Sequence, residues 1–298
     1  MYNMKEKMKQ KVFLTEAFLQ EELKQCSPQK NLREIMEYAV MNGGKRLRPV
    51  LMLSVFELFE SEIAKAVPYA AAMEMIHSYS LVHDDLPCMD DDDLRRGKPT
   101  CHKRYSEFGA VLAGDALLNL SMETMLKYAN HFPAERAMAA MQYITTASGA
   151  KGMCAGQMTD MEQSVTDFDS LSLMYSQKTG ALLKASVAVG AILGGAKKET
   201  LALLEQYADT IGLMFQIQDD VLDVTSDAET LGKPILSDEK NKKITFVSEY
   251  GLEQCKQLLK EYEKKAISLL EMVAQSVNNQ DAVLFLKDLT LFLVNRNY

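Results

Sequence analysis

Residues 81–100 read LVHDDLPCMDDDDLRRGKPT, and this stretch gathers unusually dense charge of both signs. Six Asp fall within the ten residues 84–93, and Arg95, Arg96 and Lys98 follow at once. Carboxylates this close repel one another and shift each other's pKa. A folded protein must compensate such a cluster, either with its own cations or with a bound ion.

A helix is expected to end inside this stretch. His77 and Asp84 are seven residues apart and therefore share one face of a helix. Asp90 would point elsewhere on an unbroken helix. Pro87 removes a backbone donor and can bend the helix end. The sequence therefore predicts a bend that brings Asp90 back to Asp84.

A second acidic cluster lies in GLMFQIQDDVLDVTSD, residues 212–227. On an ideal helix Gln216, Asp219, Asp220 and Asp223 fall within an arc of about 100°, and the opposite face is apolar. None of these Asp has Lys or Arg four residues further on, where a surface carboxylate would normally be paired. The pattern disfavours an ordinary solvated face, although that alternative stays open.

Paired Asp without a Cys or His ligand set suit a hard cation such as Mg²⁺. Mg²⁺ typically takes one or two protein carboxylates and completes its shell with water and substrate phosphates. Two such clusters therefore indicate a polyphosphate substrate held through metal ions. A zinc site is disfavoured because the chain has 4 His, and the acidic run lacks the Gly and Glu of an EF-hand.

A basic segment, NGGKRLRPV at residues 42–50, places Lys45, Arg46 and Arg48 directly after two glycines. Exposed backbone amides and cations together form an anion cradle. The segment is not a Walker A loop, because the GxxxxGK[ST] pattern is missing. With Arg95, Arg96 and His77, the segment predicts a second anionic group that is bound directly, without metal.

The composition indicates a mostly helical globular protein. Apolar residues make up 47% of the 298 residues and charged residues 25%, while Gly and Pro number only 15 and 7. Ala, Leu, Met, Glu and Lys favour helices, strand patterns are nearly absent, and no linker divides the chain. We therefore expect residues 1–298 to form one all-α domain, a bundle of ten or more helices. The net charge of −8 disfavours a nucleic-acid partner.

Cysteine usage and hydropathy favour a cytoplasmic protein. The 5 Cys are scattered and form no CxxC pair, which is typical of reduced thiols. The first 25 residues lack the apolar core of a signal peptide. The most apolar run, residues 185–196, is too short to span a bilayer. No stable membrane insertion is expected.

Four motifs in this order resemble the short-chain trans-isoprenyl diphosphate synthases, and most closely the bacterial farnesyl diphosphate synthases. They are GGKRLRP, HDDLPCMDDDDLRRGKPT, KTG at residues 178–180 and FQIQDDVLD, and the resemblance covers essentially the whole chain. It implies the isoprenoid synthase fold, an all-α bundle around a central cavity, usually in a homodimer. It also implies about three Mg²⁺, held between Asp84, Asp85, Asp90, Asp219, Asp220 and Asp223.

The resemblance also implies roles for the basic and polar residues. The diphosphate of isopentenyl diphosphate would be bound by Gly44, Lys45, Arg48, His77 and Arg96. The allylic diphosphate would be held with the help of Arg95, Lys178 and Lys233, and Thr179 and Gln216 would line the site of the developing carbocation. The chain departs from the family after the second Asp motif, where it reads LGKPILSDEKNKKITF instead of LGKxxGKD. Lys233 and Lys243 are the candidates that remain in that segment.

Bulk just before the first Asp motif sets product length in the resembled family. The two positions are Tyr79 and Ser80, five and four residues before Asp84. The large Tyr79 favours the C15 product, farnesyl diphosphate, made from dimethylallyl or geranyl diphosphate. A buried aromatic residue without this role is the alternative.

Other functions stay open at this point. A geranylgeranyl diphosphate synthase, with a C20 product, is the nearest alternative. A terpene cyclase binds a single diphosphate, so Lys45, Arg48 and His77 would be superfluous. An HD-type phosphohydrolase needs several metal-binding His, and a non-catalytic subunit would not need intact carboxylates in both clusters.

Overall fold

The computed structural model describes residues 3–225 and 244–294. The helices in its first half are α1 (Met4–Gln25), α2 (Lys30–Met41), α3 (Leu47–Phe56), α4 (Val67–Asp84), α5 (Cys101–Arg104), α6 (Glu107–Lys127) and α7 (Ala134–Ser148). They are followed by α8 (Met153–Met161), α9 (Phe168–Tyr175), α10 (Ala181–Gly194), α11 (Lys198–Thr225), α14 (Phe246–Tyr250), α15 (Leu252–Ala274) and α16 (Gln280–Val294). Two short 3₁₀ turns span Ile63–Ala66 and Ala129–His131, and a π-helical turn spans Ser176–Gly180.

The prediction of an all-α fold with ten or more helices is confirmed. Strand structure in the described residues is limited to two antiparallel strands of two residues each, β1 (Leu94–Arg95) and β2 (Lys98–Pro99). They follow directly after the first acidic cluster. Helix α2 stops at Met41, and Gly43 follows with a φ of 90°, a conformation that favours glycine.

Two apolar cores lie on either side of α3 and α10. One core is built around α4 and α6, the other around α11, α15 and α16, and α3 and α10 supply side chains to both. This follows from their sequences, because each is apolar around nearly its whole circumference. Gly190 allows their close approach, since a Cβ there would collide with the carbonyl oxygen of Met52.

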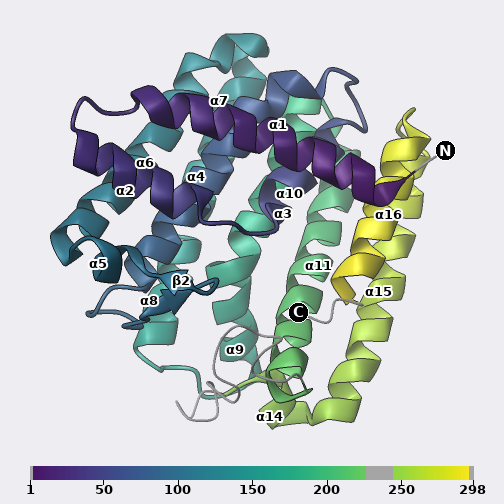
Figure 1. The fold of residues 1–298 in the computed structure, drawn as a ribbon. Helices are drawn as coiled ribbons and strands as arrows, with labels where there is room; N and C mark the ends of the chain where they lie inside the picture. The colour runs from purple at the N-terminus through teal and green to yellow at the C-terminus, as the bar shows by residue number, and fades with distance from the viewer. Residues whose placement is uncertain (1–2, 226–243, 295–298) are drawn as a thin grey trace.

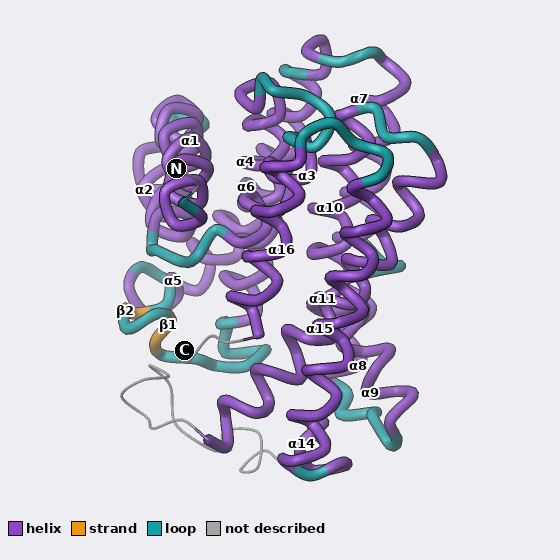
Figure 2. Tube along the Cα trace, turned by 90° about the vertical axis from the view of Figure 1, so that its right-hand side faces the viewer, coloured by secondary structure: helices purple, strands orange, loops and turns teal. Residues whose placement is uncertain are grey.

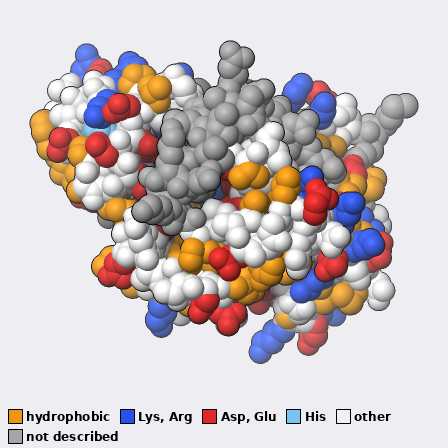
Figure 3. Space-filling model, turned by 90° about the horizontal axis from the view of Figure 1, so that it is seen from below, with side chains coloured by type: hydrophobic (Ala, Val, Ile, Leu, Met, Phe, Trp, Pro, Cys, Tyr) orange, Lys and Arg blue, Asp and Glu red, His pale blue; other side chains and the backbone are white. Residues whose placement is uncertain are grey.

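The long helices run roughly alongside one another, and α1 crosses over them (Figure 1). Turned by 90°, α1 and α2 form an outer layer beside the bundle (Figure 2). The view from below shows acidic and basic side chains interspersed around this end of the molecule (Figure 3). None of the described helices is long and apolar enough to cross a membrane.

Candidate active site

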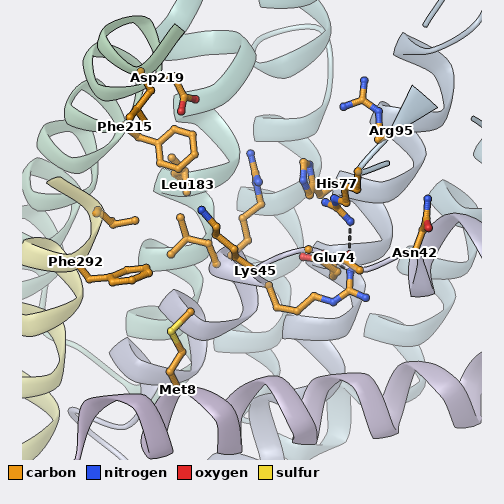
Figure 4. A pocket seen from close by; sticks show the side chains of 18 of the residues that line it. Met8, Asn42, Lys45, Glu74, His77, Arg95, Leu183, Phe215, Asp219 and Phe292 are labelled. Atoms are coloured by element: carbon orange, nitrogen blue, oxygen red, sulfur yellow. Dashed lines mark hydrogen bonds and ion pairs between the residues drawn. The ribbon is translucent and has the colours of Figure 1, made fainter. Parts of the chain in front are cut away.

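Two adjoining cavities hold most of the predicted site residues. The larger, of about 830 Å³, is lined by Lys45, Arg48, His77, Arg95 and Arg96 together with Asp219 and Asp223. Asp219, on α11, lies across this cavity from Arg95 and His77, with Lys45 between them (Figure 4). The structure therefore places the second acidic cluster opposite the basic groups.

The smaller cavity, of about 470 Å³, is largely apolar. Met153, Met158 and Met161 contribute to its wall, and Asp84, Lys178 and Thr179 lie in it as well. Arg48 and His77 line both cavities, so the two spaces meet at these side chains. Tyr79 and Ser80 also line the smaller cavity, and the chain-length role that the family resemblance implies for them stays a prediction.

The first acidic cluster bends as predicted. Helix α4 ends at Asp84, and the chain turns back so that the backbone N–H of Asp90 donates to the carbonyl of Asp84 at 2.9 Å. Burial raises the pKa of Asp84 to about 6, the positive charge of Lys178 opposes this shift, and the charge of Asp90 adds to it. Asp84 thus lies close to Asp90, in a buried position that disfavours the negative charge of Asp84.

Asp85 has a different environment from Asp84. It accepts a hydrogen bond from Nε of Arg95 at 2.7 Å, and it lines neither cavity. Burial raises the pKa of Asp85, and Arg95 opposes that shift. Arg95 also reaches Asp92, at 3.5 Å. This guanidinium therefore fixes the acidic loop and faces the larger cavity at the same time.

The second acidic cluster, like the first, contains carboxylates that line a cavity and one that is held by other residues. Asp219 and Asp223 line the larger cavity, whereas Asp220 accepts hydrogen bonds from the hydroxyl of Tyr175 at 3.2 Å and the backbone N–H of Phe246 at 2.7 Å. Asp220 thereby ties α11 to α9 and α14. Gln216 is buried on α11 and is absent from the lining of both cavities. Metal binding by Asp220 and a role for Gln216 stay predictions.

The glycine-rich loop after α2 packs against Arg96. Nη1 of Arg96 donates to the carbonyl of Gly43, and a Cβ at Gly44 would lie 2.6 Å from the Arg96 guanidinium. Gly44, with a φ of 115°, is therefore required both for the turn and for this close contact.

Two basic side chains beside this loop, Arg48 and His77, are buried away from solvent. Burial lowers the pKa of Arg48 to about 10, and its Nε has no hydrogen-bond partner among the described residues. Burial and the neighbouring arginines lower the pKa of His77 well below its usual range. The imidazole of His77 is therefore neutral, and Arg48 is available to an anion.

The sequence predicts Arg46 as a third member of the anion cradle, and the structure engages this residue differently from Lys45 and Arg48. Its side chain lines the larger cavity beside Lys45 and Arg48, but its guanidinium is buried and donates to Glu16, Glu74 and the carbonyl of Val40. The left-handed backbone at Arg46, with a φ of 49°, turns the side chain inward.

Sequence reasoning missed a group of residues on α8. Asp160 pairs with Nζ of Lys178 at 2.6 Å, and Gln157 lines the smaller cavity with both amide atoms lacking a partner among the described residues. A Cβ at Gly156 would collide with the backbone nitrogen of Lys178 in the π-helical turn. The segment GQMTD, residues 156–160, carries these residues, but its partners lie about twenty positions away in sequence, beyond the reach of a periodicity argument.

Lys233 and Lys243, the remaining predicted residues, lie outside the described residues.

The carboxylates suit magnesium that is shared with a phosphate. Within residues 3–225 and 244–294, no three His, Cys, Asp or Glu side chains converge into a ready-made metal site. Asp84 offers carboxylate oxygens to the smaller cavity, with Asp90 close to it, and Asp219 and Asp223 offer theirs to the adjoining cationic cavity. One or two carboxylates per ion, completed by substrate oxygens, is the arrangement that Mg²⁺ prefers.

Comparison with known proteins gives one consistent family. Residues 29–282 match the model of the polyprenyl synthetase family. A dimethylallyltranstransferase from Fischerella ambigua (strain UTEX 1903) is 42% identical over 285 residues, which cover 91% of this chain and 82% of the relative. Geranylgeranyl pyrophosphate synthase 11 of Arabidopsis thaliana, a chloroplastic protein, is 43% identical over 80% of this chain and 69% of its own length.

A solved structure shares the fold. The apo structure of an FPP/GFPP synthase from Zymomonas mobilis superposes with a TM-score of 0.86 at 34% identity, and the match covers 98% of this chain and 99% of that one. The isoprenoid synthase fold predicted from the motifs is confirmed by this match. The chain therefore belongs to the polyprenyl synthetase family of prenyltransferases.

Proposed function

We propose that this protein is a Mg²⁺-dependent prenyltransferase that condenses isopentenyl diphosphate with dimethylallyl or geranyl diphosphate to give farnesyl diphosphate. One observation carries this proposal. A cavity with Asp219 and Asp223 on one side and Lys45, Arg48 and Arg96 on the other adjoins an apolar cavity that contains Asp84. This arrangement offers space for two diphosphates and one hydrocarbon tail.

The reaction breaks the C1–O bond of the allylic diphosphate and joins that carbon to the terminal alkene carbon of isopentenyl diphosphate. A proton is then lost to the released pyrophosphate. Bound Mg²⁺ ions would act as Lewis acids and neutralise the negative charge that develops on the leaving pyrophosphate. We propose that Asp84, Asp85, Asp90, Asp219, Asp220 and Asp223 hold them, about three in all.

The side chains of this protein supply binding, charge and exclusion of water. Lys178, held by Asp160, and Arg95, held by Asp85, place fixed positive charge near the allylic diphosphate. Lys45, Arg48 and Arg96 bind the second diphosphate, and neutral His77 contributes one N–H donor. The apolar wall of the smaller cavity keeps water from the carbocation, and Thr179 lies in that wall.

The proposed C15 product rests on Tyr79. Its side chain is buried on α4, lines the smaller cavity and packs edge-on against His83 at 5.8 Å between ring centroids. A ring in this position shortens the space for a growing tail. A C20 product is the second candidate, because several similar relatives are named geranylgeranyl pyrophosphate synthases.

A product assay tests the proposal. The purified protein is incubated with Mg²⁺, isopentenyl diphosphate and either dimethylallyl or geranyl diphosphate, and the products are dephosphorylated and weighed by mass spectrometry. We expect farnesol as the main alcohol from both starters. Geranylgeraniol as the main alcohol would favour the second candidate, and the absence of any chain extension would contradict prenyl transfer.

We further propose a cytoplasmic homodimer. Phe108 and Leu112 on α6 are 74% and 54% exposed, and they lie one turn apart on one helix face. Light scattering on the wild type and on Leu112→Glu tests this state, with a smaller particle expected for the variant.

A further inference from the structure

Arg46 lies between two cavity cations and itself lines the larger cavity, yet each nitrogen of its guanidinium donates to an acceptor within the protein. Its guanidinium donates to acceptors on three helices. Nε reaches Glu16 on α1 at 3.0 Å, Nη1 reaches Glu74 on α4 at 2.9 Å, and Nη2 reaches the carbonyl of Val40 on α2 at 2.8 Å. The planar fork of an arginine suits this three-way contact, and a lysine cannot reproduce it.

The backbone at Arg46 decides where its neighbours point. A φ of 49° is unfavourable for a residue with a Cβ, so surrounding contacts must hold it. The carbonyl of Arg46 accepts the N–H of Val50 at 3.0 Å and opens α3. Lys45 is the residue before this point, and Arg48 lies in the first turn after it. Any movement of Arg46 therefore moves both cavity cations.

Glu74 connects Arg46 to the rest of the basic cluster. It is buried, lines the larger cavity and stands one turn before His77 on α4. Its negative charge also acts on Arg48 and Arg96. Arg46 holds this carboxylate in place and offsets its charge. Glu74 can therefore stabilise the positive charges of Arg48 and Arg96 without repelling an anion in the cavity.

We propose that Arg46 is a positioning residue for the diphosphate that is bound directly, without metal. It fixes Lys45, Arg48 and Glu74 and does not touch the substrate. The inference rests on the proposed function, in which this diphosphate is that of isopentenyl diphosphate. Loss of Arg46 should therefore weaken binding of isopentenyl diphosphate while sparing the allylic substrate.

The chain offers a matched control in Lys11. This cation is buried like Arg46, pairs with Glu57 at 2.7 Å and lies 4.6 Å from the centre of the Phe285 ring. It ties α1 to the far end of α3 and lines neither cavity. A purely structural effect of losing a buried cation should appear equally in Lys11→Met and Arg46→Met.

The experiment compares wild type, Arg46→Met, Arg46→Lys and Lys11→Met. Calorimetric titration with isopentenyl diphosphate measures its Kd independently of catalysis. Steady-state kinetics give KM for each substrate while the other substrate is saturating. For Arg46→Met we expect Kd and KM for isopentenyl diphosphate to rise by about tenfold or more, with KM for geranyl diphosphate changed by less than about threefold. Arg46→Lys keeps the charge and should lie between wild type and Arg46→Met. Lys11→Met should keep both constants while its melting temperature falls.

Two results would overturn the inference. One is an Arg46→Met or Arg46→Lys protein that binds isopentenyl diphosphate as the wild type does, and the other is an equal rise in KM for both substrates. Failure of the proposed function would look different, because the wild type itself would then bind no isopentenyl diphosphate or form no prenyl product. If Arg46→Met does not fold, the Kd and KM values of Arg46→Lys are compared with those of the wild type instead.

Discussion

At the scale of single residues, the carboxylates of the two acidic clusters are not equivalent. Asp84 and Asp219 line the cavities, whereas Asp85 and Asp220 are engaged by Arg95 and by Tyr175 with Phe246. The first pair therefore faces the cavities, and the second pair has a structural task whatever else it does.

This difference leads to a mutational prediction. Asp84→Ala and Asp219→Ala should each lower kcat for condensation by about a hundredfold or more, because charge on the leaving group loses its counterion. Melting temperatures should stay within a few degrees of wild type, since neither change empties an apolar core. Asp220→Ala is the comparison, and it should lower the melting temperature by breaking contacts with α9 and α14. Retained turnover in both cavity variants would contradict the mechanism.

The lowered pKa of His77 makes a prediction about acid stability. The unfolded chain binds a proton at this residue near pH 6.5, whereas the folded chain does so only at lower pH. Stability is therefore lost as pH falls through about 6.5, at up to about 1.4 kcal/mol per pH unit. His77→Gln removes this contribution, so its free energy of unfolding should decline less than that of wild type between pH 7.5 and 5.5. Parallel urea titrations that show equal declines would refute this assignment.

Tyr79 gives a prediction about product length. Tyr79→Ala opens the wall of the smaller cavity and should shift the main product from C15 toward C20. Ser80→Ala changes a neighbouring lining residue with little change in volume and should keep the wild-type profile. Chromatography of the dephosphorylated products measures both, and an unchanged C15 profile in Tyr79→Ala would leave Tyr79 as an ordinary buried aromatic residue.

At the scale of elements, the π-helical turn Ser176–Gly180 is fixed by close contacts on two sides. Helix α8 touches it at Gly156, where a side chain would collide with the Lys178 backbone, and a Cβ added at Gly212 of α11 would lie 3.6 Å from the Cα of Gly180. π-turns inside helices are frequent at functional sites, and this one carries Lys178 and Thr179. Its position therefore depends on a small residue in α8.

Two alanine substitutions test this dependence. Gly156→Ala should push the turn away from α8 and lower kcat by about tenfold to a hundredfold, since small misplacements of reacting groups are costly. Gly180→Ala adds the same methyl group within the turn, where the nearest atom is 3.5 Å away, and it should be nearly neutral. Steady-state kinetics of the two variants decide the matter, and equal activity would show that the contact at Gly156 is dispensable.

Periodicity and residue type predicted much of the site but not the direction of every side chain. The bend at Pro87 follows from local geometry, and so does the position of Asp219 and Asp223 on one cavity, whereas Asp220 of the same predicted arc is engaged elsewhere. Arg46 could not be assigned, because its direction depends on Glu16 and Glu74, which are distant in sequence. The engagement of Asp220 and the pairing of Lys178 with Asp160 are tertiary contacts of the same kind.

At the scale of the whole molecule, Mg²⁺ and pyrophosphate should act together on stability. The acidic groups come from the end of α4 and from α11, so a bridged pyrophosphate would link elements of both apolar cores. Saturating Mg²⁺ with pyrophosphate should raise the melting temperature by at least about 3 °C more than the two added separately. Differential scanning fluorimetry measures this. EDTA should reverse the shift, and Asp84→Ala should show little of it, whereas simple additivity in wild type would contradict bridging.

The shared wall formed by α3 and α10 has a mechanical consequence. Because each helix gives side chains to both hydrophobic cores, neither half of the bundle can loosen without exposing apolar surface of the other. Heat should therefore melt the two halves in a single cooperative step, and a cavity-forming substitution in this wall should weaken both at once.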